Sequence, residues 1–231
     1  SGTDLGITPS SLDVSATGAA VYTIPIAVPA GINGVQPNLA LTYNSQAGND
    51  IAGYGWNNTG ISKISRVGST PYHNGQLTGV NLTETDQFAL DGQRLLLKEG
   101  THGADGAVYE TENFSNVKVI AKGTFGNGIF GPSYFEVLYP DGSKAYYGKG
   151  EKSSDPLQYN ISSWENAIGI SIIYKYVKVN NMSLPDVINY QGGSISFTYD
   201  PIPRKRPISF YVAGIYFENI RPLLSIDTYA D

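Results

Sequence analysis

The segment from Gly18 to Asn58 constrains the fold of this chain more than any other part of the sequence. Val21 to Val28 is rich in β-branched and aromatic residues, and Leu39 to Tyr43 shows the period-2 alternation of a half-buried strand. Pro29 and Gly31 end the first run. The segment therefore predicts two strands joined by a stiff connector.

A glycine-rich loop follows the second strand. Its glycines surround two large aromatic side chains, at positions where one backbone segment can approach another closely: Gly48, Gly53, Gly55 and Gly60 around Tyr54 and Trp56. Because Gly53 and Gly55 leave room for an indole against the backbone, we expect Trp56 to be a core residue. Its replacement by alanine would then cost about 3 to 5 kcal/mol of stability.

The composition favours many short strands joined by tight turns. The 231 residues include 27 glycines, 13 prolines and 17 tyrosines, and only 15% of them are charged. A chain of this length can bury a core as one large domain or as two small ones. We predict an all-β fold of repeated antiparallel hairpins, forming a β-sandwich or part of a β-shell, with little helix.

Three dipeptides mark the expected hairpins. Asp91-Gly92 and Asp141-Gly142 each lie between apolar runs, and Asp-Gly tolerates the positive φ angles of a type I′ turn. Gln191-Gly192 separates two further strand-like runs. We divide the chain into an amino-terminal tail that is ordered only if it pairs with a sheet edge, and two blocks that pack as one continuous β domain: residues 1–17, 18–133 and 134–231.

Five short motifs occur in a fixed order in the first block. They are Pro29–Gly34, Pro37–Ser45, Gly53–Trp56, Ile64–Arg66 and Asp86–Leu95. Together they resemble the amino-terminal domain of SpvB-type proteins, the opening module of RHS/YD-repeat proteins and of Tc-toxin B components. The resemblance marks these residues as the structural motif: Pro37, Tyr43, Asn44, Ser45, Gly53, Gly55, Trp56, Asp91 and Gly92.

The second block resembles the same family through passages similar to YD repeats. Ser163–Tyr176 and Ile188–Tyr199 carry the pattern, with departures at Asn166 and Ile170. Those departures leave open whether this is a true repeat or a hairpin of similar design.

The resemblance implies a non-catalytic structural module of a larger secreted or surface polypeptide. In the family, such modules help to build a β-rich shell for containment and delivery of a carboxy-terminal toxin. The implied partners are the downstream part of the same polypeptide, a toxin cargo or a toxin-complex subunit, and the implied location is extracellular or at the bacterial cell surface. The alternatives are a free-standing glycan-binding domain and an enzyme whose site the sequence does not reveal.

Charge and cysteine content exclude several classes of partner and chemistry. The net charge is -5 with only 15 Lys and Arg, which argues against nucleic-acid binding. The basic run Arg204-Lys205-Arg206 is typical of a solvated turn, and no apolar run is long enough for a membrane span. Without cysteine the chain has no disulfide, thiolate metal ligand or cysteine nucleophile.

Two patterns imitate enzyme motifs. Gly126 to Gly131 fits G-x-G-x-x-G, but Pro132 follows at once and no helix pattern comes after it. Glu110-Thr111-Glu112 with the earlier Arg66 imitates the motif order of the ADP-ribosyltransferase domain that some SpvB-type proteins carry. The spacing is wrong, and we expect an exposed acidic strand edge instead.

The remaining candidate groups also favour a structural interpretation. His73 and His102, the only histidines, stand in loop-like sequence without a recognisable triad or zinc set, so we predict no catalytic, cofactor or metal residue and no cofactor. Tyr146 and Tyr147, with Tyr174 and Tyr176, could stack on sugars, but neighbouring strand residues face opposite sides and we expect inward packing.

The two ends of the sequence suggest an excised piece of a longer polypeptide. Ser1-Gly2 shows no initiator Met and no signal pattern, and the strand-like run Leu223–Ala230 reaches the end without a turn signal. We expect this last strand to leave an unpaired sheet edge.

Overall fold

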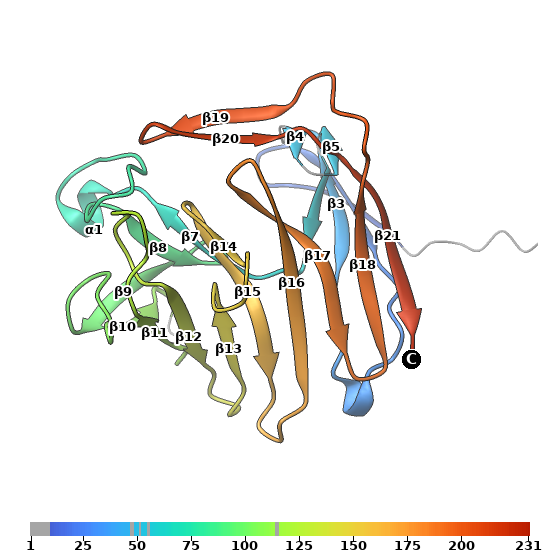
Figure 1. Cartoon of the computed structure of the whole chain (residues 1–231), viewed down its shortest axis with the longest axis horizontal. Coiled ribbons are helices and arrows are strands. Elements are labelled where there is room, and N and C mark those ends of the chain that lie inside the picture. The colour runs from blue at the N-terminus through green and yellow to red at the C-terminus, as the bar shows by residue number, and fades with distance from the viewer. Residues whose placement is uncertain (1–9, 47–48, 51, 55, 114–115) are drawn as a thin grey trace, which may run out of the picture.

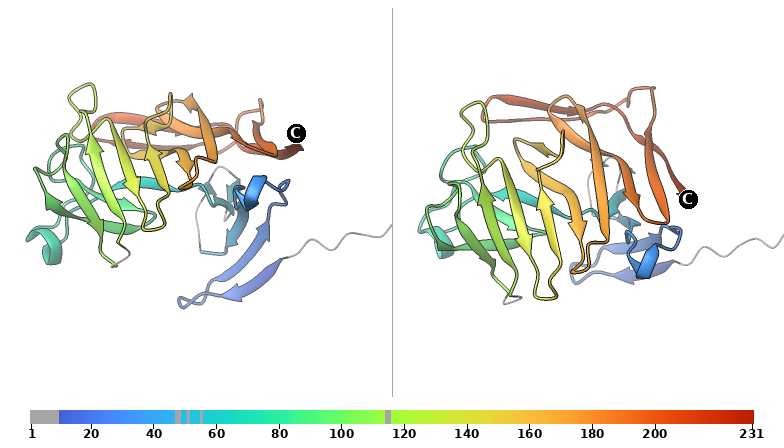
Figure 2. Two further views of the ribbon diagram at one scale, coloured as in Figure 1. Left: turned by 90° about the horizontal axis from the view of Figure 1, so that it is seen from below. Right: turned by 60° about the horizontal axis from the view of Figure 1, so that its bottom comes forward.

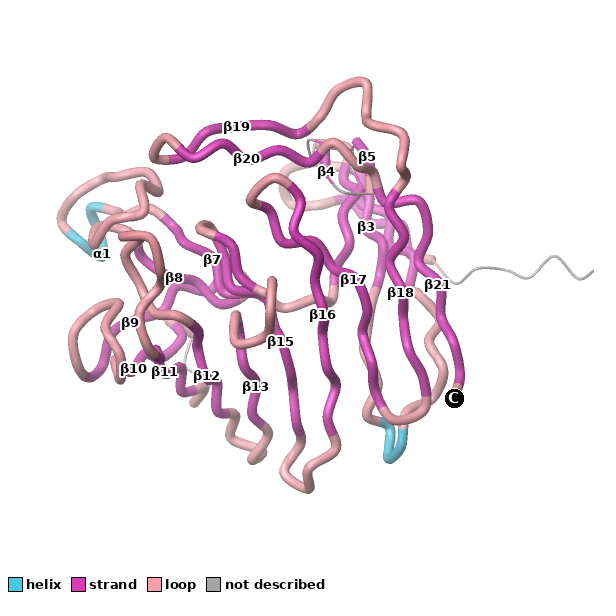
Figure 3. The backbone as a smooth tube through the Cα atoms, viewed as in Figure 1, coloured by secondary structure: helices cyan, strands magenta, loops and turns pink. Residues whose placement is uncertain are grey.

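The computed structural model describes residues 10–46, 49–50, 52–54, 56–113 and 116–231. Strands make up 50% of it and helix 3%, which confirms the all-β prediction (Figure 3). Over this described part, no helix is long and apolar enough to cross a membrane.

The elements have the following bounds. They are β1 (Ser11–Val14), β2 (Ala20–Pro25), a 3₁₀ turn (Ile32–Gly34), β3 (Ala40–Asn44), β4 (Asn49–Asp50), β5 (Gly53–Tyr54), β6 (Trp56–Thr59), β7 (Lys63–Val67), α1 (Pro71–Asn74), β8 (Gln87–Leu90), β9 (Gln93–Glu99), β10 (Val108–Thr111), β11 (Lys118–Lys122), β12 (Tyr134–Leu138), β13 (Lys144–Tyr147), β14 (Ser154–Asp155), β15 (Gln158–Glu165), β16 (Ser171–Val179), β17 (Met182–Tyr190), β18 (Gly193–Tyr199), β19 (Ile208–Val212), β20 (Ile215–Asn219) and β21 (Leu223–Ala230).

A four-stranded sheet, in the order β1-β2-β3-β6, is formed by strands between Ser11 and Thr59. β2 and β3 pair antiparallel, as the two runs in the sequence predict. β1 pairs with β2, so residues 11–14 of the tail are ordered at a sheet edge, as expected; residues 1–9 lie outside the described part. Figure 2 shows this sheet standing beside the rest of the molecule.

Eight strands close into a barrel in the order β7, β8, β9, β10, β11, β12, β13 and β15, and β15 pairs back to β7. All eight pairings are antiparallel. Closure takes place within β15, where residues 158–160 pair with β7 and residues 161–165 pair with β13. The expected boundary at residue 133 falls inside this barrel, because β11 and β12 pair across it.

Aromatic side chains fill the barrel. The barrel strands alternate buried and less buried residues, so every second side chain points inward. Phe135 lies edge-on to Phe88 and to Tyr159, with ring centroids 5.2 and 4.9 Å apart, and all three residues are almost fully buried. A barrel this small is therefore a packed core with no open lumen.

An open sheet continues from the barrel. The carboxyl half of β15 also pairs with β16, and β17, β18 and β21 follow (Figure 1). β21 ends this sheet and, among the described residues, pairs with β18 alone. A separate hairpin, β19–β20, crosses the top of the molecule in Figure 1.

The expected hairpins form, with one correction. Asp91 and Gly92 both have positive φ, at 47° and 81°, as a type I′ turn requires. Gln191-Gly192 joins β17 to β18 as predicted. The type I′ prediction for Asp141-Gly142 is wrong, because only Gly142 has positive φ. Pro140, which directly precedes Asp141, has a φ fixed at a negative value by its ring. The loop therefore becomes a longer turn, in which Gly142 N–H donates to the Tyr139 carbonyl.

Candidate functional site

The aromatic motif residues form a cluster in the four-stranded sheet. Trp56 begins β6 and lies opposite Tyr43 of β3, with ring centroids 5.4 Å apart, and Tyr22 of β2 packs against it edge-on at 6.5 Å. Trp56 is half-buried and is not part of the main hydrophobic core, where we expected it. Gly53 belongs to β5, and Gly55 lies outside the described residues.

The Asn-Ser pair of the motif fixes the end of β3. The Ser45 hydroxyl accepts a hydrogen bond from Ala20 N–H at 3.0 Å, while Ser45 N–H donates to the Ala20 carbonyl. Asn44 Oδ1 accepts from Gln46 N–H at 2.8 Å, which turns the chain away from the sheet. These contacts assign both residues to local structure.

Pro37 belongs to the connector between β2 and β3. It is buried, and Leu39 two residues later is 1% exposed in the main core. At the other end of the connector, the Tyr190 hydroxyl donates to the Pro29 carbonyl at 2.8 Å. The connector therefore fastens the four-stranded sheet to the β17–β18 hairpin.

Asp91 joins the barrel to the segment that enters it from β6. Its carboxylate accepts hydrogen bonds from the Ser62 hydroxyl at 2.5 Å and from Lys63 N–H at 2.9 Å. Ser62 is also 2.8 Å from the Tyr147 hydroxyl, which lies 3.3 Å from that of Tyr139. The sequence marked Asp91 and Gly92 as a turn and Tyr147 as an inward-packing tyrosine, but it gave no sign that Ser62 connects them, because the three are distant in sequence.

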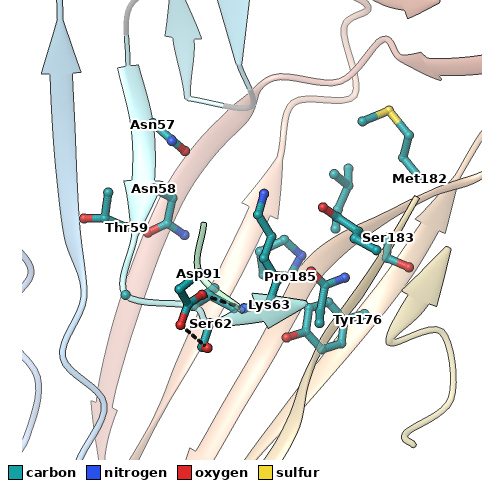
Figure 4. Close-up of a pocket in the computed structure, with 15 residues that line it drawn as sticks. Asn57, Asn58, Thr59, Ser62, Lys63, Asp91, Tyr176, Met182, Ser183 and Pro185 are labelled. Atoms are coloured by element: carbon teal, nitrogen blue, oxygen red, sulfur yellow. Dashed lines mark hydrogen bonds between the residues drawn. The ribbon is translucent and has the colours of Figure 1, made fainter. Parts of the chain in front are cut away.

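A cavity of about 670 Å³ lies between β6 and β17 (Figure 4). Residues 57–63 form one wall, residues 182–185 form another, and Gln158, Asn160 and Tyr176 of the neighbouring strands complete it. Asp91 and Ser62 stand at its edge with their hydrogen bond intact. A smaller cavity of about 400 Å³ lies on Pro37, Trp164 and the same Ser62–Asp91 pair.

Arg66 of the I-x-R motif is a buried structural group. Its guanidinium lies 3.7 Å from the Asp86 carboxylate, and both side chains are fully buried. Arg66 also donates to the Pro156 carbonyl at 2.7 Å and to the Phe130 carbonyl. Asp86 accepts from two loop N–H groups, those of Asn81 and Leu82, at 2.8 Å each. The pair ties three loops to the end of the barrel.

The groups that imitate a transferase motif do not assemble around Arg66. Glu110 pairs with Lys98 at 3.2 Å, and Glu112 pairs with His73 at 2.9 Å. The expected acidic strand edge is wrong for Glu110, because β10 has β9 and β11 on its two sides. Glu110 therefore serves an ion pair and Glu112 a contact with His73, both away from Arg66.

His102 and the glycine-rich pattern are also structural. His102 bridges the Asp86 carbonyl at 2.7 Å and the Tyr109 hydroxyl at 3.1 Å. Gly126 to Gly131 lies in the loop between β11 and β12, and a Cβ at Gly131 would come within 3.1 Å of Arg66 and Tyr159. No group of three or more His, Asp or Glu arranged to hold a metal occurs in the part of the chain that is described.

The tyrosines considered for sugar stacking pack mainly inward. Tyr147 is 0% exposed, Tyr176 5% and Tyr174 9%. Burial raises the pKa of Tyr174 to about 12 and that of Tyr147 and Tyr176 well above its usual value. Tyr146 faces outward, where the Lys149 ammonium lies 3.8 Å from its ring centroid. The expected inward packing is therefore found for Tyr147, Tyr174 and Tyr176 but is wrong for Tyr146, and the four rings form no common platform.

Residues 14–125 match a protein-family model described as SpvB, Salmonella virulence plasmid 65kDa B protein. All five sequence motifs fall within this range. No curated protein matches the chain.

Several solved structures share the fold. The structure of TcdB2-TccC3 has a TM-score of 0.74 at 18% identity, over 100% of this chain and 15% of that chain. The Photorhabdus luminescens Tc holotoxin pore has a TM-score of 0.72 at 18% identity, over 100% of this chain and 14% of that one. The N-terminal domain of effector protein SpvB from Salmonella typhimurium strain LT2 has a TM-score of 0.67 at 18% identity, over 90% of this chain and 87% of that one.

Proposed function

We propose that the chain, whose residues 14–125 match the SpvB family model, is a non-catalytic structural module of a secreted or surface protein of the RHS/Tc-B type. Its role is to form part of a β-rich shell that contains and delivers a carboxy-terminal toxin. The partners in this proposal are the downstream polypeptide and a toxin cargo or toxin-complex subunit.

The observation that carries the proposal is the use of one fold in two settings. The chain matches 87% of the SpvB N-terminal domain structure, and it also matches a 15% portion of the TcdB2-TccC3 chain. A fold that serves as a separate domain in one protein and as a small part of another is expected to be a building unit. The second of these structures combines TcdB2 with TccC3, which motivates the toxin partner proposed here.

The sheet edges support a role in assembly. β21 spans eight residues, pairs on one side only among the described residues, and exposes Leu224 and Tyr229 by 60% and 54%. A long edge with apolar side chains normally finds a pairing partner, since its N–H and C=O groups are unpaired. A following segment of a shell is such a partner.

The polar groups support a non-catalytic role. Arg66, Asp86 and His102 hold loops to the barrel, and the Ser62–Asp91 pair holds a strand connection. Each candidate group is thus engaged in a contact that positions backbone.

Proteolysis of the natural gene product tests containment. We expect proteinase K to leave a carboxy-terminal segment intact in the native protein, and to cleave it when Leu224→Lys and Tyr229→Lys disrupt the β21 edge. The matched control is Tyr72→Lys with Leu77→Lys, two exposed side chains far from that edge in sequence. Equal cleavage of both double variants would contradict the proposal, as would NAD-dependent ADP-ribosyl transfer by the isolated chain.

A further inference from the structure

One wall of the larger cavity includes the edge of a strand. Residues 57–59 of β6 line it consecutively, followed by residues 60–63 of the connection to β7, although successive side chains in a strand point to opposite faces. Consecutive strand residues can line one cavity only if the strand presents its edge. β6 is the last strand of its sheet and pairs with β3 on its other side, so alternate β6 residues turn their N–H and C=O groups toward the cavity.

Buried polar groups in the same cavity lack partners. Both amide atoms of Asn58 and the Nδ2 of Asn160 are buried and form no hydrogen bond, and Asn160 is 5% exposed. A buried donor or acceptor without a partner destabilises the folded protein. An occupant that supplies acceptors and a donor together would satisfy these groups.

The exposed side chain of Lys63 brings a positive charge to the cavity. The Lys63 side chain extends from the start of β7 into the space between β6 and β17 (Figure 4). Lys63 takes part in none of the ion pairs among the described residues. The one acidic residue of the described lining is Asp91, whose carboxylate already binds the Ser62 hydroxyl and the Lys63 backbone N–H.

We propose that this cavity binds an extended peptide segment carrying an acidic side chain, which adds as a strand to the free edge of β6. A peptide group supplies the acceptor and the donor that Asn58 requires, and a carboxylate matches Lys63 and the Asn160 amide. The volume of about 670 Å³ falls within the roughly 300–1,000 Å³ of ligand pockets. Strand addition supplies affinity through backbone hydrogen bonds and specificity through alternate side chains.

The test uses the isolated chain labelled with ¹⁵N and a capped pentapeptide, acetyl-Val-Thr-Glu-Thr-Val-amide. We expect saturable shifts of the backbone amides of β6 and of the Asn58 and Asn160 side-chain amides. Lys63→Gln should weaken binding about three- to fivefold, as loss of a solvent-accessible ion pair does. The matched control Lys118→Gln removes an exposed lysine of β11 and should leave the affinity unchanged.

Methylated peptides test strand addition without altering the protein. A strand donates to its neighbour through alternate N–H groups only. N-methylation of one alternate set should therefore abolish binding, while N-methylation of the other set should preserve it. Equal effects of the two sets, absence of saturable shifts, or shifts produced instead by a neutral hexose would overturn the proposal.

Discussion

The carboxylate of Asp91 accepts a hydrogen bond from the hydroxyl of Ser62 at 2.5 Å, across 29 residues of sequence. This contact joins the β8–β9 turn to the segment that leads from the four-stranded sheet into the barrel. Both cavities border it. The Ser62–Asp91 contact therefore lies where the four-stranded sheet and the barrel meet.

Replacing Asp91 should loosen this junction. Asp91→Ala removes the acceptor of two hydrogen bonds and places alanine at a φ of 47°, so we expect a loss of about 1 to 2 kcal/mol in denaturant unfolding. Asp91→Asn keeps an acceptor and tolerates positive φ, and should lose less. Equal losses in both variants would contradict a hydrogen-bonding role.

The buried pair of Arg66 and Asp86 predicts a larger effect. Arg66→Met leaves a buried carboxylate without its counter-charge and two carbonyl groups without their donor, so we expect a loss of about 3 to 5 kcal/mol in the free energy of unfolding. Lys98→Met, which breaks a half-exposed pair with Glu110, is the control and should lose less than about 1 kcal/mol. Similar losses in the two variants would refute the structural role of Arg66.

Alkaline pH should destabilise the fold through its buried tyrosines. Burial raises the pKa of Tyr147, Tyr159 and Tyr176, so the folded state favours the neutral phenols. Their contribution is fully present below the unfolded pKa of about 10 and is lost as pH rises through the higher folded pKa values. Denaturant unfolding between about pH 8 and 12 should therefore show falling stability, with late tyrosinate absorbance.

Phenylalanine variants separate these tyrosines from general alkaline effects. Tyr159 and Tyr176 donate to the Pro132 and Ile161 carbonyls at 2.8 and 2.6 Å, bonds that a phenolate cannot form. Tyr159→Phe and Tyr176→Phe should lose about 1 kcal/mol at pH 7 but decline less steeply above pH 10. An unchanged alkaline slope in both variants would count against this explanation.

Local patterns predicted the strands and most hairpins but could not predict the barrel. The runs at 21–28 and 39–43 and the Asp91-Gly92 turn are set by neighbouring residues. The structure contains the turn and the two strands β2 and β3, although β2 ends at Pro25. Closure depends on Gln158 of β15 lying opposite Ser65 of β7, a pairing that no local signal encodes. The Ser62–Tyr147 contact could not be predicted for the same reason, because the two residues are far apart in sequence.

Two sequence expectations failed for identifiable physical reasons. Asp141 resembles Asp91 in its dipeptide, but Pro140 sets a turn in which only the glycine takes positive φ. Trp56 was expected in the core because of its glycines, whereas β6 is an edge strand that leaves the indole half-buried against two tyrosines. The Asp-Gly dipeptide alone does not determine the turn type. The glycines around Trp56 alone do not show that β6 is an edge strand.

The exposed edge of β21 predicts self-association of the isolated chain. Leu224 and Tyr229 are more than half exposed on a strand with one partner among the described residues, so two copies can pair there. Sedimentation velocity should show concentration-dependent association that Leu224→Lys with Tyr229→Lys abolishes. The Tyr72→Lys and Leu77→Lys control should still associate, and a monomer at all concentrations would contradict the prediction.

Hydrogen exchange of β21 is the most direct test of the structural role. In the isolated chain, kept dilute enough to be monomeric, the amides on the outer edge of Leu223–Ala230 should exchange fast, while those paired with β18 exchange slowly. In the natural gene product, the outer amides should become protected because another part of the shell pairs with them. Fast exchange of the same amides in both proteins would contradict the account of this chain as a shell-building module.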